Sequence, residues 1–192
     1  MMENSVRNNF RQTNAFAMQY GLLLGAWGLL SLAAFVQSFT NVYLSPVSSL
    51  MFLATPLLAG WMTFRFRARV SVPGEVFTLG RGFAFSYLTG LYAAVWIAAG
   101  VFVYLSYVDH GYVFDAYERL LSQPGMAEQL RQNSQLAGLA GGGELTPQSV
   151  VAAMRAIPPS NYAGVVIYTT VLFGPLFALV IGLVCRRRPS WA

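Results

Sequence analysis

Four long apolar runs, none with a charged side chain, limit what this chain can fold into. They cover residues 17–36, 46–64, 82–108 and 162–184. A helix needs about 20 residues, at about 1.5 Å each, to cross a hydrocarbon core of roughly 30 Å. Each run has about that length or more, so we predict four transmembrane helices.

The composition also favours a lipid environment for this chain. Only 10% of its residues are charged and 56% are hydrophobic, whereas a soluble domain has about 25% charged residues. So few charges cannot cover a globular surface in water. We therefore predict an all-α polytopic membrane protein, a single integral membrane domain over residues 1–192, with a small helical extracytoplasmic cap between helices 3 and 4.

The basic residues, all of them arginine, predict the orientation. If the N-terminus is cytoplasmic, nine of the twelve fall on the inner side: Arg7, Arg11, Arg65, Arg67, Arg69, Arg81, Arg186, Arg187 and Arg188. The outer side then keeps Arg119, Arg131 and Arg155. Because loops rich in arginine stay inside, we expect both termini in the cytoplasm.

The predicted outer segment, residues 109–161, carries helix signals of its own. The sequence predicts short helices over Tyr112–Leu121, over Met126–Ala140 and from Thr146 onward. Asp115 and Arg119 stand four apart, the spacing of a helical ion pair. Thr146 followed by Pro147 has the pattern of a helix N-cap and first residue. The glycines at 141–143 are expected to break the middle helix.

Small residues recur at every fourth position in the spans. The third run has Gly82, Ser86, Gly90, Ala94 and Ala98; the fourth has Gly174, Ala178 and Gly182; the first has Ala17, Gly21 and Gly25. Helices in lipid associate through close backbone approach, which small residues permit. These columns therefore predict helix packing, against either another span of this chain or a second protein.

Two prolines interrupt the spans, Pro56 in the second and Pro175 in the fourth. Each removes a backbone donor, so each is expected to kink its helix. Paired helix breaks sometimes mark transporter sites, although membrane helices also tolerate proline without any such role.

Residues with obvious chemistry are few. The single histidine, His110, stands beside Asp109, and the single cysteine is Cys185; a zinc site needs three or four ligands. No span holds an ionisable side chain of the kind that proton relays and ion sites use. The sequence predicts no catalytic residue, no metal site and no cofactor, and it shows no nucleic-acid-binding signature.

The segment FRFRARV, residues 64–70, places arginines two apart. If it is extended, Arg65, Arg67 and Arg69 share one face and the apolar residues share the other. With Arg81, which begins the next span, these guanidinium groups then meet lipid phosphates. The alternative is that the arginines only anchor the loop inside.

The whole arrangement resembles a known family. It is carried by Pro73-Gly74-Glu75-Val76-Phe77, then Gly80-Arg81-Gly82-Phe83, the long outer segment and a last span that ends in basic residues. From about Phe16 to Arg188 the chain resembles the domain of unknown function 4199 family, found mainly in Bacteroidota. This chain has arginine where relatives often have lysine, and its outer segment has an unusual glycine-rich break. The resemblance implies four helices in an inner membrane and brings no known activity.

Three functions are compatible with this sequence. The first is a non-catalytic subunit or accessory of a membrane assembly, in contact with membrane lipids and with another membrane protein or a second copy. The second is a small carrier or channel for a small or lipidic substrate, with its site at the two prolines. The third is a lipid-modifying enzyme that uses Asp109, His110, Asp115 and Glu118.

Overall fold

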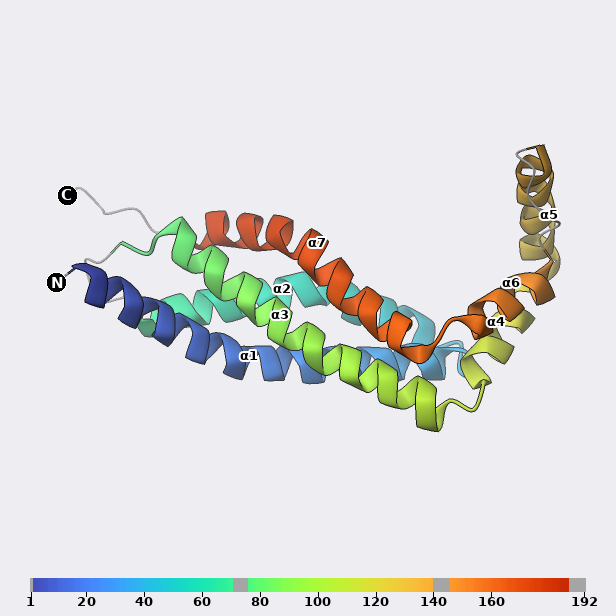
Figure 1. The fold of residues 1–192 in the computed structure, drawn as a ribbon, viewed down its shortest axis with the longest axis horizontal. Coiled ribbons are helices and arrows are strands. Elements are labelled where there is room, and N and C mark those ends of the chain that lie inside the picture. Colours follow the sequence, from blue (N-terminus) through green and yellow to red (C-terminus); the bar gives the residue numbers. More distant parts are fainter. Residues whose placement is uncertain (1, 71–75, 140–145, 187–192) are drawn as a thin grey trace. The chain divides into compact units, whose positions relative to one another are not determined.

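The computed structural model describes residues 2–70, 76–139 and 146–186, which form α-helices joined by short connections (Figure 1). The helices are α1 (Met2–Ser38), α2 (Leu44–Val70), α3 (Leu79–Val103), α4 (Tyr112–Leu121), α5 (Pro124–Leu139), α6 (Pro147–Ala156) and α7 (Pro159–Cys185). A π-helical turn, Tyr104–Val108, continues α3. By length and apolar composition α1, α2, α7 and α3 with its π-helical turn can each cross a membrane, which confirms the all-α fold with four predicted spans.

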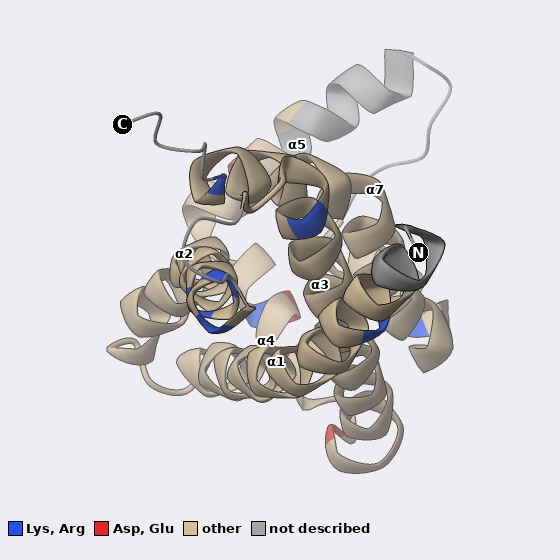
Figure 2. Cartoon of the chain, turned by 90° about the vertical axis from the view of Figure 1, so that its left-hand side faces the viewer, with Lys and Arg blue, Asp and Glu red and all other residues tan. Residues whose placement is uncertain are grey.

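The chain divides into two compact units. The first combines Met1–Gly100 with Ala163–Ala192, and the second is Val101–Tyr162. In the first unit the spans alternate in direction, so that α1 begins, α2 ends, α3 begins and α7 ends at one end (Figure 1). We call this the basic end, because Arg11, Arg65, Arg67, Arg69, Arg81 and Arg186 lie there in the sequence. Figure 2 looks onto it and shows basic residues on the ends of α2 and α3.

The structure corrects the interpretation of residues 64–70 as an extended segment. They form the last two turns of α2, which runs on to Val70. Residues 64–70 contain neither proline nor glycine, and a continued helix keeps the backbone groups hydrogen-bonded next to lipid. At about 100° per residue, Arg65 and Arg69 share one face of α2 and Arg67 faces the opposite way.

The continued helix also brings Phe66 into an aromatic core near the basic end. Phe66 is fully buried, and its ring stacks on that of Phe85 with 4.1 Å between centroids. The rings of Phe77 and Phe16 lie 6.1 Å and 5.6 Å from it. Such aromatic pairs add about 0.5–1.5 kcal/mol each beyond the burial of their surface. This aromatic cluster therefore packs α1, α2 and α3 against one another.

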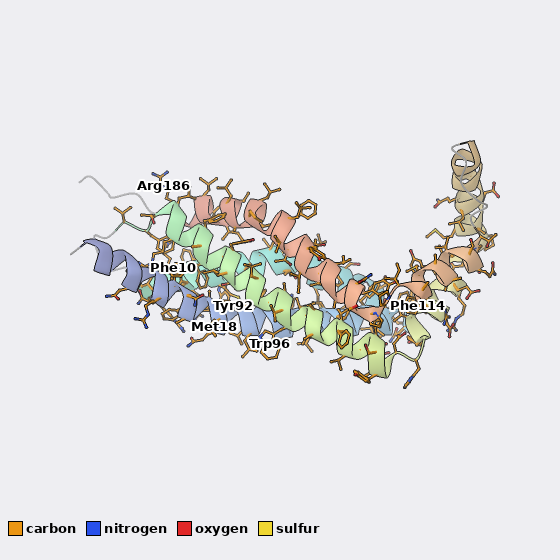
Figure 3. All side chains as sticks on the ribbon, viewed as in Figure 1. Phe10, Met18, Tyr92, Trp96, Phe114 and Arg186 are labelled. Carbon is orange, nitrogen blue, oxygen red and sulfur yellow. The ribbon has the colours of Figure 1, made fainter. Side chains whose placement is uncertain are left out.

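The α1–α3 contact is close enough to need glycine. A Cβ atom built on Gly21 would overlap the Cβ of Tyr92, and one built on Gly25 would lie 2.8 Å from the Cβ of Trp96. The Tyr92 hydroxyl donates to the side-chain carbonyl of Asn14 at 2.8 Å. Trp96 itself is 50% exposed, on the outer side of the bundle (Figure 3).

Serine and threonine hydroxyls in the first unit mostly donate to carbonyls of their own helix. Among the described residues of this unit, six donate to the carbonyl four residues earlier, at 2.8–3.0 Å: those of Thr13, Ser31, Ser49, Thr55, Thr63 and Thr170. A polar group without a partner is costly in lipid. These bonds give the six hydroxyls a partner within their own helix, whereas the buried hydroxyl of Thr89 in α3 has none among the described residues.

In the second unit the predicted local signals match the helices. The helix α4 covers the predicted range Tyr112–Leu121, and α6 begins after Thr146, whose hydroxyl accepts from the backbone N–H of Ser149. The predicted helical ion pair is wrong: Asp115 pairs with Arg155 of α6 instead. Because α6 packs against α4, it supplies a cation that sequence spacing does not reveal. The Nε of Arg119 donates to the backbone carbonyl of Asp115 at 3.3 Å.

Three features named from the sequence lie outside the described residues. They are the Pro73-Gly74-Glu75 part of the family motif, the glycine break at 141–143, and Arg187 with Arg188.

Candidate functional site

A cavity of about 450 Å³ lies among the spans of the first unit. Residues of α2, α3 and α7 line it, together with Leu24 of α1. Its volume falls within the roughly 300–1,000 Å³ that is usual for small-molecule sites. Because all four spans contribute, the cavity lies within the part of the bundle that is predicted to be in lipid.

The small-residue columns create much of this space. Ser86, Gly90 and Ala94 of α3 line the cavity, and so do Gly174 and Ala178 of α7. A Cβ on Gly90 would meet only the methyl group of Thr170, at 3.9 Å. At Gly90 the missing side chain therefore leaves room, whereas at Gly174 the Tyr87 ring lies 3.2 Å from the position of an added Cβ; at neither residue do two backbones come together.

Nearer the basic end the same columns meet. A Cβ on Gly82 would lie 3.3 Å from the Cα of Gly182, and one on Gly182 would lie 3.0 Å from the backbone nitrogen of Phe83. Ala98, the last member of the α3 column, is buried but does not line the cavity. The helix-packing role of the whole column stays a prediction, and its members occupy two different settings.

Both interrupting prolines are close to the cavity in sequence or in space. Pro56 lines it, and Gly174, the residue before Pro175, lines the α7 side. Both helices continue through their prolines, and Figure 1 shows α7 changing direction along its length. Since proline has no N–H, the Phe52 carbonyl loses its helical donor at position 56. Phe52 also lines the cavity.

Apolar and uncharged groups form the cavity wall. Phe173, Phe177 and Ile181 of α7 line it, and so do Phe52 and Ala59 of α2. The polar lining side chains are Thr55, Ser86, Tyr87, Thr169 and Thr170. No lining residue is ionisable at neutral pH. A cavity of this chemistry excludes ions and suits an apolar molecule.

The four arginines predicted to meet lipid phosphates fall into two groups. Arg65 and Arg69 line a cleft between α1 and α2. Arg67 donates from Nη1 to the Cys185 carbonyl at 2.8 Å, a bond that holds the end of α7 against α2. Arg81 donates from Nη2 to the side-chain carbonyl of Gln12 at 2.7 Å. The structure therefore separates two arginines at an open cleft from two that join helices.

The acidic residues and the histidine of the second unit occupy different positions. The buried carboxylate of Asp109 accepts from the backbone N–H groups of Gly111 and Val113, at 3.1 and 3.0 Å. This shows Asp109 in the capping role that follows the third span. The next residue, His110, is exposed with φ of 45°.

A shallow cleft of the second unit is lined by Asp115 and Glu118 with Arg119 and Ser122, without Asp109 or His110. In the described ranges no three His, Cys, Asp or Glu side chains are placed to hold a metal ion.

The carrier alternative placed its site at the two prolines, and Pro56 lines the cavity, but the sequence did not predict which other residues form it. The small columns and the two prolines are visible in the sequence, yet their common effect depends on how far α2 and α7 stand apart. That separation is a property of the packed bundle.

Comparison with known proteins gives a family match. A family model described as protein of unknown function (DUF4199) matches residues 16–187. No curated protein and no solved structure matches the chain. The family match confirms the resemblance seen in the sequence and carries no activity with it.

Proposed function

We propose a function from the geometry of the spans, since the chain belongs to a family whose description, protein of unknown function (DUF4199), names no activity. The protein is a multi-pass membrane protein that holds a lipidic ligand between its spans and catalyses no reaction. The observation that carries this proposal is the apolar cavity of about 450 Å³ among α2, α3 and α7. The protein lies in a bacterial inner membrane, as the family resemblance implies, and the arginine distribution supports an orientation with both termini in the cytoplasm.

The chemistry of the lining supports an apolar ligand rather than an ion or a polar solute. The wall is made of aromatic, aliphatic and small residues, with hydroxyls as its polar groups. The hydroxyls of Thr55 and Thr170 are already bonded to carbonyls of their own helices. Apolar cavities exclude water, so in a bilayer an acyl chain is the expected occupant.

The cavity size favours a compact ligand over a partner helix. One turn of helix, about 10 Å across and 5.4 Å long, takes roughly 420 Å³. The cavity therefore holds about one turn, whereas a spanning helix needs about 30 Å of length. A membrane partner or a second copy remains the second candidate function, because the broad apolar outer faces of α2 and α7 are open to contact.

Photo-crosslinking tests the proposal directly. The full chain is placed in bilayer nanodiscs that contain a phosphatidylcholine with a diazirine on one acyl chain, and the labelled residues are mapped. We expect labels on the cavity-lining stretch of α3 and α7. The variant Gly90→Leu fills the cavity and lowers that labelling roughly tenfold, which corresponds to an overpacking cost of about 1.4 kcal/mol.

The control is Gly60→Leu. A Cβ on Gly60 of α2 meets no atom within 4 Å, and Gly60 does not line the cavity. We expect it to label like the unaltered protein. Equal cavity labelling in Gly90→Leu and Gly60→Leu contradicts the ligand proposal. Recovery of a stoichiometric protein partner, with no lipid label in the cavity, supports the second candidate.

A further inference from the structure

The cleft between α1 and α2 differs in chemistry from the apolar cavity. It has a volume of about 220 Å³ and is lined by Gln19, Tyr20, Leu23, Trp61, Arg65 and Arg69. We call it the arginine cleft. It contains two guanidinium groups, one side-chain amide and two aromatic rings, and no acidic residue among its lining.

The helical geometry of α2 aligns the cationic wall. Trp61, Arg65 and Arg69 stand four apart and so lie along one face of the helix. The guanidinium carbon of Arg65 lies 4.8 Å from the Trp61 ring centre. That of Arg69 lies 6.0 Å from the Tyr20 ring centre. Stacking on aromatic faces orients a guanidinium group and leaves its in-plane N–H donors available for an acceptor.

The two arginines bring like charges together without a counter-charge. Positive charges four apart on a helix repel one another. Among the described residues no carboxylate lies within ion-pair distance of Arg65 or Arg69. An anion between them would remove the repulsion and accept several charge-assisted hydrogen bonds. Arg67, in contrast, is occupied by the Cys185 carbonyl.

The position of the cleft along the spans indicates which kind of anion it binds. Its α1 wall, Gln19 to Leu23, belongs to the first apolar run, and Trp61 belongs to the second. The arginines follow directly after that run. Tryptophan and arginine at the end of a span mark the headgroup level of a bilayer. A ligand there has its anionic group beside the arginines and its apolar part beside Leu23 and Trp61.

We infer that the arginine cleft binds a phosphate group, and that this group belongs to an anionic phospholipid of the inner leaflet. Arg65 and Arg69 donate to the phosphate oxygens, and the Gln19 amide adds a neutral donor. The inference goes beyond the proposed cavity ligand, because it concerns a different cleft, a charged ligand group and different residues.

Native mass spectrometry of the full chain tests this inference. The protein is released from nanodiscs of phosphatidylcholine with phosphatidylglycerol, and retained lipids are counted. We expect a preference for phosphatidylglycerol that falls roughly 25-fold in the double variant Arg65→Gln/Arg69→Gln, since each arginine near a membrane surface contributes about a fivefold increase in binding.

The matched control is Arg11→Gln/Arg186→Gln, which removes equal charge at the same basic end (Figure 3 labels Arg186). These side chains are exposed and do not line the arginine cleft. We expect the control to keep the lipid preference. An equal loss in both double variants reflects diffuse charge attraction and overturns the inference, as does retention unchanged in Arg65→Gln/Arg69→Gln.

A second arm separates the two sources of phosphate. Inorganic phosphate is titrated into the protein in a zwitterionic detergent, and binding is measured by calorimetry. The expected result is weak binding or none, with the phosphatidylglycerol preference intact. Tight phosphate binding that is lost in Arg65→Gln/Arg69→Gln, without lipid retention, supports the phosphate-binding cleft and overturns its assignment to a lipid.

Discussion

The close α1–α3 contact makes a sharp prediction for Gly25→Ala. The added Cβ would lie 2.8 Å from the Trp96 Cβ and 3.5 Å from the Ala93 Cα. Carbon atoms prefer separations of about 3.5–4.0 Å, so the helices must part locally by roughly 1 Å. Overpacking costs about 1–3 kcal/mol, and the better helix preference of alanine returns at most about 1 kcal/mol. We expect a net loss of about 1–2 kcal/mol.

The matched comparison is Gly60→Ala in α2, where the new methyl group meets no atom within 4 Å. Here the helix preference acts alone, so stability should be unchanged or rise by up to about 1 kcal/mol. Unfolding of both variants in mixed micelles, titrated with sodium dodecyl sulfate and followed by tryptophan fluorescence, measures the difference. If Gly25→Ala unfolds at the same midpoint as Gly60→Ala, the close-approach reasoning is wrong.

Two further predictions concern the second unit. The Asp115–Arg155 ion pair is 57% and 42% exposed, so an alanine double-mutant cycle on thermal unfolding should give a coupling of about 1 kcal/mol or less. The coupling should shrink in 1 M salt, on the order of the screening expected there, and a coupling of several kcal/mol would contradict this. Thr146→Ala should lose the N-cap of α6 at a cost of about 1 kcal/mol, seen as faster amide hydrogen exchange in α6. The exposed neighbour Gln148→Ala should leave exchange unchanged, and equal rates in the two variants would refute the capping role.

The positions of the elements followed from local sequence signals. Four uncharged apolar runs predicted the four spans, because the bilayer requires about 20 apolar residues in helical form wherever a chain crosses it. Thr146 before Pro147 predicted the start of α6, because capping is a bond between residues three apart. These features depend on neighbours in the chain and need no knowledge of the fold.

Contacts between distant segments were decided by the tertiary structure. Phe66 looked like part of a segment lying on the membrane, yet the continued α2 buries it against Phe85. Asp115 has a basic residue at the right helical spacing, yet it pairs with Arg155, which is 40 residues away in sequence. Once two helices pack, a charged side chain on the neighbouring helix can pair with a residue in preference to one that is close to it in the sequence.

The small-residue columns show most clearly where the sequence alone stops. Their spacing determined that some close approach or some open space must occur along α3 and α7. Only the packed spans decided which: backbone contact at Gly82 and Gly182, and an open cavity at Gly90. A missing side chain sets no distance by itself, because the separation of two helices at each level depends on their crossing and their bends.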